Sequence, residues 1–381
     1  MKILIVTPSF LPAHVYGGPT VSVSQLAKNI AKNNEVLVLT TLANGKDELN
    51  ITPNNIVYNE SVNIIYFKRQ SKDHSHFSLD LFKFLYKNIN NYDVIHINSW
   101  WNLVAIFSAL ICKLNHKKFI LSPRGMLSDY TFKKSIYKRI FHEIFGKYIL
   151  SGSTIHLTSK LELENVQLIL KDTNNIVIPN FVDFFNESFL GNSPKIMNSE
   201  KPLNFVFISR INEIKALDKL LHALGEIEFD FNLKIIGDGD SNYIDYLKSI
   251  AINNNINHKI KWLGPIYDDS KFKFMSSADL LILPSISENF ANIVLESLSV
   301  GTPVLISSNI GLAEFVHEFD LGWIFNGNID DLVLKLNEVN NNRNKIHEIS
   351  KISRDVINTT FDNEKLNQQY LDMYYTSINA H

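Results

Sequence analysis

Short apolar runs alternate with stretches of helical periodicity along the whole chain. Between several of the runs lie amphipathic segments, such as residues 20–33 and 101–115, whose apolar positions recur every three or four residues and predict helices. Continuous runs of Val, Ile and Leu joined by helices are typical of a parallel sheet covered on both faces. The strands predicted in the first half are residues 2–8, 35–41, 62–68, 93–98, 118–124, 153–159 and 175–180.

The pattern restarts after residues 179–202, a polar segment rich in Asn, Ser and Pro that lacks periodicity. We therefore expect an α/β protein of two Rossmann-like parallel-sheet domains that face each other across a cleft. The strands predicted in the second half are residues 203–210, 231–239, 259–265, 278–285, 302–308 and 321–325. The expected organisation is an N-terminal domain over 1–180, a linker over 181–200, a second domain over 201–360, and a helix over 361–381 that packs back on the first domain.

Composition and charge limit the possible functions. The chain has 381 residues, of which 45% are hydrophobic and 20% charged, as is ordinary for a globular protein. Its single cysteine, Cys112, excludes an internal disulfide, and no Cys/His cluster has the spacing of zinc ligands. Residues 1–180 carry 20 Lys and Arg against 12 Asp and Glu, whereas the remainder carries 17 against 27. The basic half predicts an anionic partner, unless the asymmetry is chance variation of the surface.

Two cations follow the first strand of the second domain. Arg210 ends the run at 203–210, and Lys215 lies near the start of the next predicted helix. Parallel sheets bind ligands at the carboxyl ends of their strands, and a helix N-terminus carries unpaired N–H groups, so two cations here suit a diphosphate. The alternative is a pair of solvated surface side chains.

Glycines follow two other predicted strands. Gly17 and Gly18 precede the helix at 20–33, where glycine lets backbone N–H groups approach an anion. A plain turn explains them equally well. Gly237, in "IIGDGD", belongs only to a fragment of a dinucleotide fingerprint, because the third glycine is missing at the expected spacing.

The stretch "SENFANIVLE", residues 287–296, places two acids on either side of a predicted helix start. If the helix begins near Ala291 or Asn292, Glu296 lies one turn inside it and Glu288 stays on the loop at the cleft floor. Acids that flank an anion site accept hydrogen bonds from hydroxyl groups, such as those of a ribose and a sugar. Alternatively, Glu288 caps the helix and Glu296 is a surface residue.

Together these motifs resemble the retaining glycosyltransferases of family 4, which have the GT-B fold. The resemblance covers nearly the whole chain, and the Glu-x7-Glu pair followed by "GTPV" is its most specific part. It implies transfer of a sugar from a UDP- or GDP-linked donor in surface polysaccharide synthesis, without a cofactor. We expect no metal site, because Arg210 and Lys215 can take the place of a metal ion. The remaining motifs, in the family's order, are "DVIHIN", "SPRGML", "VIPNFVD", "SRINEIK" and "GDGD".

The resemblance also implies a role for each matching residue of the donor site. Arg210 and Lys215 would clamp the diphosphate of the donor and stabilise its charge as it leaves. Glu296 would hold the ribose hydroxyls, and Glu288 would contact the transferred sugar. The backbone and glycine positions that complete the donor site would be Gly17, Gly18, Gly237, Phe290, Ala291 and Asn292.

On the acceptor side the matching residues are His96, Asn98 and Arg124, and the chain departs from the family at two places. Many relatives carry a cleft histidine where this chain has Asn98, so we expect only a positioning hydrogen bond from that residue. His96 fits the inward-facing strand pattern of a structural residue. Ala216 stands where a glycine is usual, a change that we expect to cost little.

Other functional classes stay open at this point. A nucleotide-sugar epimerase or phosphorylase on the same fold would yield a rearranged or phosphorylated sugar and no acceptor product. A Rossmann oxidoreductase is disfavoured by the incomplete glycine fingerprint. A non-catalytic partner would bind the nucleotide sugar without turnover. We expect no nucleic acid partner.

Residues 130–150, "YTFKKSIYKRIFHEIFGKYIL", combine cations with aromatic and aliphatic residues on one broad predicted helical face. A basic, aromatic helix can rest on an anionic bilayer, whereas an ordinary helix would bury its apolar face in the domain core. Together with the basic first domain, this segment leads us to expect a lipid-linked glycan acceptor. The expected location is cytoplasmic, peripheral on the inner face of the cell membrane.

Overall fold

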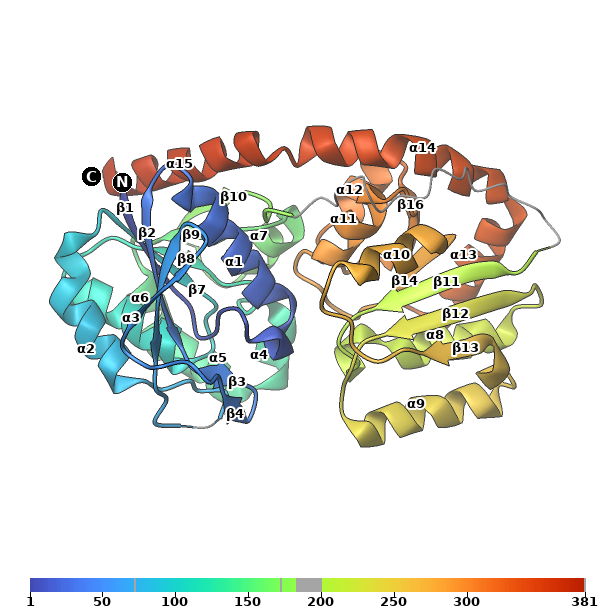
Figure 1. Ribbon diagram of the computed structural model, residues 1–381, viewed down its shortest axis with the longest axis horizontal. Helices are drawn as coiled ribbons and strands as arrows, with labels where there is room; N and C mark the ends of the chain where they lie inside the picture. The colour runs from blue at the N-terminus through green and yellow to red at the C-terminus, as the bar shows by residue number, and fades with distance from the viewer. Residues whose placement is uncertain (72, 172, 183–200, 380–381) are drawn as a thin grey trace. The chain divides into compact units, whose positions relative to one another are not determined.

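A computed structural model describes residues 1–71, 73–171, 173–182 and 201–379. Almost all of the linker predicted at 181–200 therefore lies outside the described residues. The chain divides into two compact units: unit 1 comprises Met1–Phe181 and the segment that begins at Asn363, and unit 2 comprises Val182–Asp362. Each unit is built on its own sheet of mainly parallel strands covered by helices, which confirms the predicted α/β class (Figure 1).

The sheet of unit 1 has the strand order β10-β9-β8-β7-β1-β2-β6-β5. Its strand pairs are parallel except for β5 with β6. All seven predicted strands are present, and the edge strand β5 was not predicted. A short antiparallel ribbon, β3–β4, forms a separate pair. The bounds are β1 Lys2–Val6, β2 Glu35–Thr41, β3 Ala43–Asn44, β4 Asp47–Glu48, β5 Ile56–Asn59, β6 Val62–Phe67, β7 Val94–Asn98, β8 Ile120–Ser122, β9 Thr154–Leu157 and β10 Asn174–Val177.

Helices cover both faces of this sheet. α1 and α15 pack together on one face, and α2, α3 and α6 on the other (Figure 1). The second face holds a large apolar core that includes Leu4, Ile97, Trp100 and the buried Cys112. The helical bounds are η1 His14–Tyr16, α1 Gly18–Ala31, α2 Leu79–Asn88, η2 Ile89–Asn91, α3 Leu103–Leu114, α4 Asp129–Lys134, α5 Ile136–Phe141, the π-helical turn η3 His142–Gly146, α6 Lys147–Leu150, α7 Lys160–Gln167 and α15 Asn363–Asn379.

The sheet of unit 2 is entirely parallel, with the order β13-β12-β11-β14-β15-β16, and contains all six predicted strands. The chain order reverses between β11 and β14, and such a switch point is where open parallel sheets bind ligands. α8, α9 and α13 pack together on one face, and α10, α11 and α14 on the other (Figure 1). The strands are β11 Leu203–Ile208, β12 Phe231–Ile236, β13 Ile260–Trp262, β14 Leu280–Leu283, β15 Val304–Ser307 and β16 Gly322–Phe325. The helices are η5 Glu213–Lys215, α8 Leu217–Glu226, α9 Ser241–Asn253, η6 Asn257–Lys259, α10 Ser270–Ser277, α11 Asn292–Ser299, α12 Ala313–Glu318, α13 Ile329–Asn341 and α14 Arg343–Thr360.

The basic, aromatic segment at 130–150 is not one helix. α4 ends at Lys134, and the extended Ser135 begins α5 by accepting a hydrogen bond from the N–H of Lys138. α5 then continues through the π-helical turn into α6. The interpretation that its apolar face lies in the core is wrong for most of these residues, although Phe141 does pack against the core. Side chains that are 50% to 82% exposed are Ile136, Tyr137, Ile140, Ile144 and Tyr148.

None of the helices in the described ranges is both long and apolar enough to cross a bilayer.

Candidate functional site

Loops that follow neighbouring strands of unit 2 meet at the carboxyl edge of its sheet. The N–H of Ile286, after β14, donates to the carbonyl of Ile214, after β11, at 2.8 Å. The N–H of Glu288 donates to the carbonyl of Asn309, after β15, at 3.1 Å. These backbone bonds hold the loop of Glu288 between two others. The structure therefore places this loop beside the one that carries both predicted cations.

Lys215 and Glu288 form an ion pair within this edge, from Nζ to Oε2. Their side chains are 11% and 23% exposed, so the pair is largely withdrawn from water. Arg210 is exposed and has no hydrogen-bond or carboxylate partner among the described residues. One predicted cation is thus neutralised by a predicted acid, and the other is available to an anion.

Glu296 has its own lysine partner. Its Oε2 lies 2.6 Å from Nζ of Lys271, at the start of α10, and the two side chains are 11% and 23% exposed. The interpretation of Glu296 as a surface residue is therefore wrong, since its relative exposure is only 9%. Nothing in the sequence singled out Lys271, because the pair forms only when α10 and α11 pack side by side.

The helix between the two acids begins at Asn292, as predicted. The residue before it, Ala291, has left-handed backbone with φ 67°, and no side chain caps the helix. Glu288 is therefore not a helix cap, and that alternative is wrong. Phe290 is buried, with its ring 6.3 Å from that of Phe361, and this contact fixes the approach of the chain to the helix.

Gly237 has a packing reason to be glycine. A Cβ atom there would lie 1.8 Å from the carbonyl oxygen of Ser209, and one at Gly239 would lie 2.0 Å from that of Ile211. The loop after β12 therefore approaches the loop after β11 more closely than a side chain allows. This close approach accounts for both glycines without a ligand, and the predicted donor contact of Gly237 stays a prediction.

The same loop contains an Asp-x-Asp sequence, Asp238-Gly239-Asp240, whose spacing is typical of metal sites. Asp240 caps α9 by accepting from the N–H groups of Asn242 and Tyr243, at 3.0 and 3.2 Å. Asp238 accepts from the N–H of Gly239 at 2.8 Å. Both carboxylates thus serve local turns. Over the described part of the chain, no group of three or more His, Cys, Asp or Glu side chains could hold a metal ion.

In unit 1, the loop after β1 carries Gly17 and Gly18. Gly17 has φ 65°, a left-handed conformation that favours glycine. Gly18 begins α1, and a Cβ atom added there would meet nothing within 4 Å. Open space around Gly18 means that packing does not explain this glycine, in contrast to Gly237.

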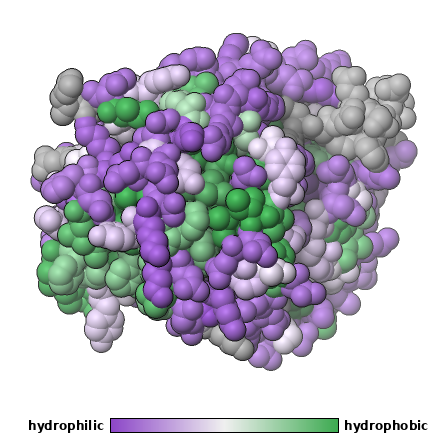
Figure 2. Space-filling view, turned by 60° about the vertical axis from the view of Figure 1, so that its left-hand side comes forward, coloured by the Kyte–Doolittle hydropathy of each residue, from purple (hydrophilic) through white to green (hydrophobic). Residues whose placement is uncertain are grey.

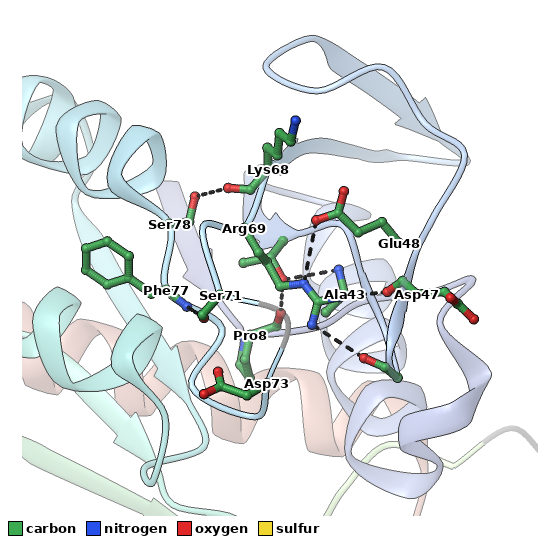
Figure 3. A network of polar contacts seen from close by, with 12 residues as sticks. Pro8, Ala43, Asp47, Glu48, Lys68, Arg69, Ser71, Asp73, Phe77 and Ser78 are labelled. Carbon is green, nitrogen blue, oxygen red and sulfur yellow. Dashed lines mark hydrogen bonds and ion pairs between the residues drawn. The ribbon is translucent and has the colours of Figure 1, made fainter.

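A buried arginine supports this loop through the β3–β4 ribbon (Figure 3). Arg69 donates to the carbonyl of Asp47 at 2.7 Å, and its Nε lies 3.8 Å from Glu48. The ribbon in turn contacts the loop, because the N–H of Gly45 donates to the hydroxyl of Tyr16 at 3.1 Å. Arg69 was not predicted as a site residue, since only the fold brings its loop to the ribbon.

The acceptor-side residues lie at the carboxyl edge of the unit 1 sheet. Oδ1 of Asn98 accepts a hydrogen bond from Nη2 of Arg124 at 3.0 Å, and its predicted role towards the acceptor stays a prediction. Arg124 also donates to Asn180. Asn98 is fully buried and Arg124 nearly so, and Nδ2 of Asn98 has no partner among the described residues.

His96 belongs to a buried chain of polar side chains. Its Nδ1 lies 3.0 Å from the hydroxyl of Tyr374 on α15, and its Nε2 lies 2.6 Å from Oγ of Ser122. Ser122 continues to Nδ1 of His156 at 2.6 Å, whose other nitrogen lies 2.9 Å from the carbonyl of Ile178. Burial lowers the pKa of His156 to about 3 and that of His96 well below its usual value, so both rings are neutral at pH 7.

Comparison with protein families assigns almost the whole chain. The profile described as "Glycosyltransferase Family 4" matches residues 16–184, and the profile described as "Glycosyl transferases group 1" matches residues 192–356. A similar curated protein is an uncharacterized glycosyltransferase of Methanocaldococcus jannaschii, 25% identical over 89% of each chain.

Solved structures show the same fold. Anabaena HepE, solved in complex with UDP, superposes with a TM-score of 0.76 at 18% identity, over 99% of this chain and 100% of that one. WaaG, a glycosyltransferase involved in lipopolysaccharide biosynthesis, superposes with a TM-score of 0.70 at 13% identity over 100% of both chains. These matches confirm the GT-B fold that the sequence motifs implied.

Proposed function

Because the chain belongs to the family 4 glycosyltransferases of the GT-B fold, we propose that it transfers a sugar from a nucleoside-diphosphate sugar to a lipid-linked glycan in surface polysaccharide synthesis. The observation that carries this proposal is that, of the two predicted cations of unit 2, one is paired with an acid and the other is not. Arg210 is exposed, and it lies in the same segment after β11 as Lys215, whose only charged partner among the described residues is Glu288. The complex of HepE with UDP supports a nucleoside diphosphate as the ligand.

The charges of unit 2 suit the departure of a diphosphate. When the bond between the anomeric carbon and the phosphate oxygen breaks, negative charge develops on the leaving group. Arg210, Lys215 and the uncapped N-terminus of α11 supply positive charge at one edge of the sheet. The reaction requires no cofactor. These groups stabilise the charge of the leaving diphosphate, as a metal ion does in other transferases.

The ion pair of Lys215 and Glu288 is the resting state of this site. A bound diphosphate competes with Glu288 for Lys215, and Glu288 is then released to accept a hydrogen bond from a hydroxyl of the transferred sugar. Lys271 holds Glu296 in the same way until the ribose binds, and Glu296 then accepts a hydrogen bond from a ribose hydroxyl. Each acid of the Glu-x7-Glu pair is thereby kept partnered until a hydroxyl arrives.

The transfer retains configuration at the anomeric carbon. The acceptor oxygen attacks from the face that the diphosphate leaves, a new C–O bond forms as the old one breaks, and a phosphate oxygen takes the acceptor proton. No protein base is needed for this step, which agrees with Asn98 in place of a cleft histidine. The proton and the electron pair both end on the diphosphate.

The acceptor lies at an anionic membrane surface, on its cytoplasmic side. Support comes from the exposed apolar side chains of residues 136–148, which alternate with Lys138, Arg139 and Lys147. Figure 2 shows one face of the protein, on which hydrophobic residues lie directly beside hydrophilic ones. Apolar side chains among cations suit the boundary between lipid headgroups and acyl chains.

A thermal-shift screen of nucleoside diphosphates and their sugars tests the donor, because a bound ligand raises the melting temperature by mass action. The donor that stabilises best is then incubated with membrane lipid extract, and mass spectrometry detects the glycosylated lipid. Binding with a rearranged or phosphorylated sugar and no acceptor product would replace the proposal with an epimerase or a phosphorylase. Failure of every nucleotide to stabilise the protein would end it.

A further inference from the structure

Unit 1 contains a pocket of about 470 Å³ that none of the candidate site residues lines. Its walls are the α4–α6 segment and the turn after α7, which includes Leu168 and Lys171. This turn precedes β10, whereas α4 in the other wall follows β8. The acceptor-side residues His96, Asn98 and Arg124 do not line the pocket, so it is treated as a separate site.

Positive charge dominates the lining of the pocket. Both lining acids are paired along the helical segment, Asp129 with Lys133 at 2.5 Å and Glu143 with Lys147 at 2.6 Å. These are exposed pairs one turn apart, which contribute little and rearrange readily. The two further lining cations, which have no carboxylate partner among the described residues, are Arg139 and Lys171.

A buried histidine, His142, lies in the wall of the pocket. It is 2% exposed, and both of its ring nitrogens are enclosed by protein atoms. Burial lowers the pKa of the ring, and the backbone of Ile169 acts in the opposite direction. A ligand in the pocket therefore lies near the ring without bonding to its nitrogens, and the ring can report that the pocket is occupied.

Apolar surface adjoins these polar groups. Leu168 lines the pocket and is 76% exposed, and Ile144 follows His142 by two residues and is 61% exposed. A ligand held here therefore contacts both charge and apolar surface.

We propose that this pocket binds a phosphoryl group, with Arg139 and Lys171 as its charge partners. A phosphoryl oxygen accepts charge-assisted hydrogen bonds, and an arginine can supply two of them in parallel. Two sources share this chemistry, an anionic lipid headgroup and a soluble phosphorylated ligand. The site extends the proposed membrane association but does not depend on nucleotide binding, which takes place in unit 2.

The test uses the full-length protein with ¹³C-labelled histidine, and the His142 ring signal is identified with the His142→Asn variant. Inorganic phosphate, glycerol phosphate, vesicles of neutral lipid and vesicles that contain phosphatidylglycerol are added in separate titrations. We expect a saturable shift of the His142 signal. Arg139→Gln weakens the apparent affinity about tenfold, because a charge-assisted hydrogen bond is lost.

Lys134→Gln is the matched control, since it removes the same charge from the same segment at a side chain that does not line the pocket. It should keep the affinity within about twofold. Response to the soluble phosphates assigns a soluble ligand, and response only to anionic vesicles assigns the lipid headgroup. Lys171→Gln repeats the test from the other wall. The proposal is overturned if no probe moves the His142 signal, or if both Arg139→Gln and Lys134→Gln weaken the response equally. Nucleotide binding by the same variants, measured separately, reports on the transferase proposal alone.

Discussion

At the carboxyl edge of the unit 1 sheet, His96, Asn98 and Arg124 are buried and bonded to neighbouring side chains. At the same edge of unit 2, Arg210 is exposed and Lys215 is paired with a partly exposed Glu288. The two sheets share their topology type and present polar residues at the same place. They differ in Arg210, an exposed cation without a partner among the described residues, which has no counterpart among the three residues of unit 1. Lys215 and Arg124 are each 9% exposed.

This difference distinguishes polar residues that hold the fold together from polar residues that are available to a ligand. A buried polar group whose bonds are complete holds neighbouring segments together, and its removal leaves its partners unsatisfied. An exposed cation without a partner gains free energy from an arriving anion. The buried chain from Tyr374 to Ile178 accordingly ties α15 and the end of unit 1 to the sheet. The edge of unit 2 is the edge prepared for a ligand.

The largest expected effect follows from removal of the paired cation of unit 2. Lys215→Met should lower the transfer rate by about 10³-fold, because one preorganised positive group at the leaving diphosphate is lost. Product formation with the donor found in the thermal screen measures the rate. Lys248→Met makes the same chemical change at an exposed lysine of α9 and should retain activity. Equal rates in both variants would remove the functional difference between the two edges.

A second prediction concerns Arg69, a buried polar residue that follows the carboxyl end of β6 in unit 1. Arg69→Met should lower the free energy of unfolding of unit 1 by about 3 kcal/mol, because the carbonyl of Asp47 loses its donor in a buried site. Lys68→Met is the control, because Lys68 directly precedes Arg69 and its side chain is exposed (Figure 3). Hydrogen exchange at residues 43–48 reports the loosening of the ribbon. An unchanged exchange rate would show that Arg69 does not hold it.

A third prediction uses pH. The folded pKa of His156 is about 3, against 6.5 for an ordinary histidine, so the unfolded chain binds a proton first as the pH falls. The contribution of this residue to the free energy of unfolding is complete above pH 6.5. Below that pH it declines by about 1.4 kcal/mol per pH unit, so that about 2 kcal/mol are lost at pH 5. Hydrogen exchange of β7–β9 at several pH values measures it. His156→Phe should make the pH dependence shallower, and an identical slope would contradict the assignment.

The smallest effect is expected at the family's glycine position. Ala216 has left-handed backbone, with φ 49°, and is fully buried, which explains why a glycine is usual there. Ala216→Gly relieves backbone strain but removes a buried methyl group, so the free energy of unfolding should change by less than about 1 kcal/mol. Ala216→Val should destabilise by more, because branched residues avoid this conformation. The melting temperatures of the two variants test that order.

Much of the fold follows from local sequence patterns. Each predicted strand is a continuous apolar run, and a buried parallel strand needs little else. The edge strand β5 was missed because each of its faces carries only one strongly apolar residue, Ile56 on one and Val57 on the other. Its sequence, "IVYN", is therefore not a continuous apolar run. The break at Ser135 was missed because capping by its hydroxyl competes with a helical pattern that continues on both sides.

The site was predictable only where its residues follow strands. Arg210, Lys215 and Glu288 each come soon after one, and parallel strands end at a common edge. Lys271 and Tyr374 were not found, because helix packing brings each to a partner that is distant in sequence. The glycine at 237 was assigned to the ligand from a motif, whereas its close approach to Ser209 exists only in the folded chain.

Calorimetric titration of the protein with UDP and GDP tests the central claim, that the charged edge of unit 2 binds a diphosphate. Arg210→Gln should weaken the better-bound nucleotide at least about tenfold, because a charge-assisted hydrogen bond is lost. Glu288→Gln should bind it at least as tightly as the native protein does, because the acid no longer competes for Lys215. Native affinity in Arg210→Gln, or weaker binding in Glu288→Gln, would contradict the account.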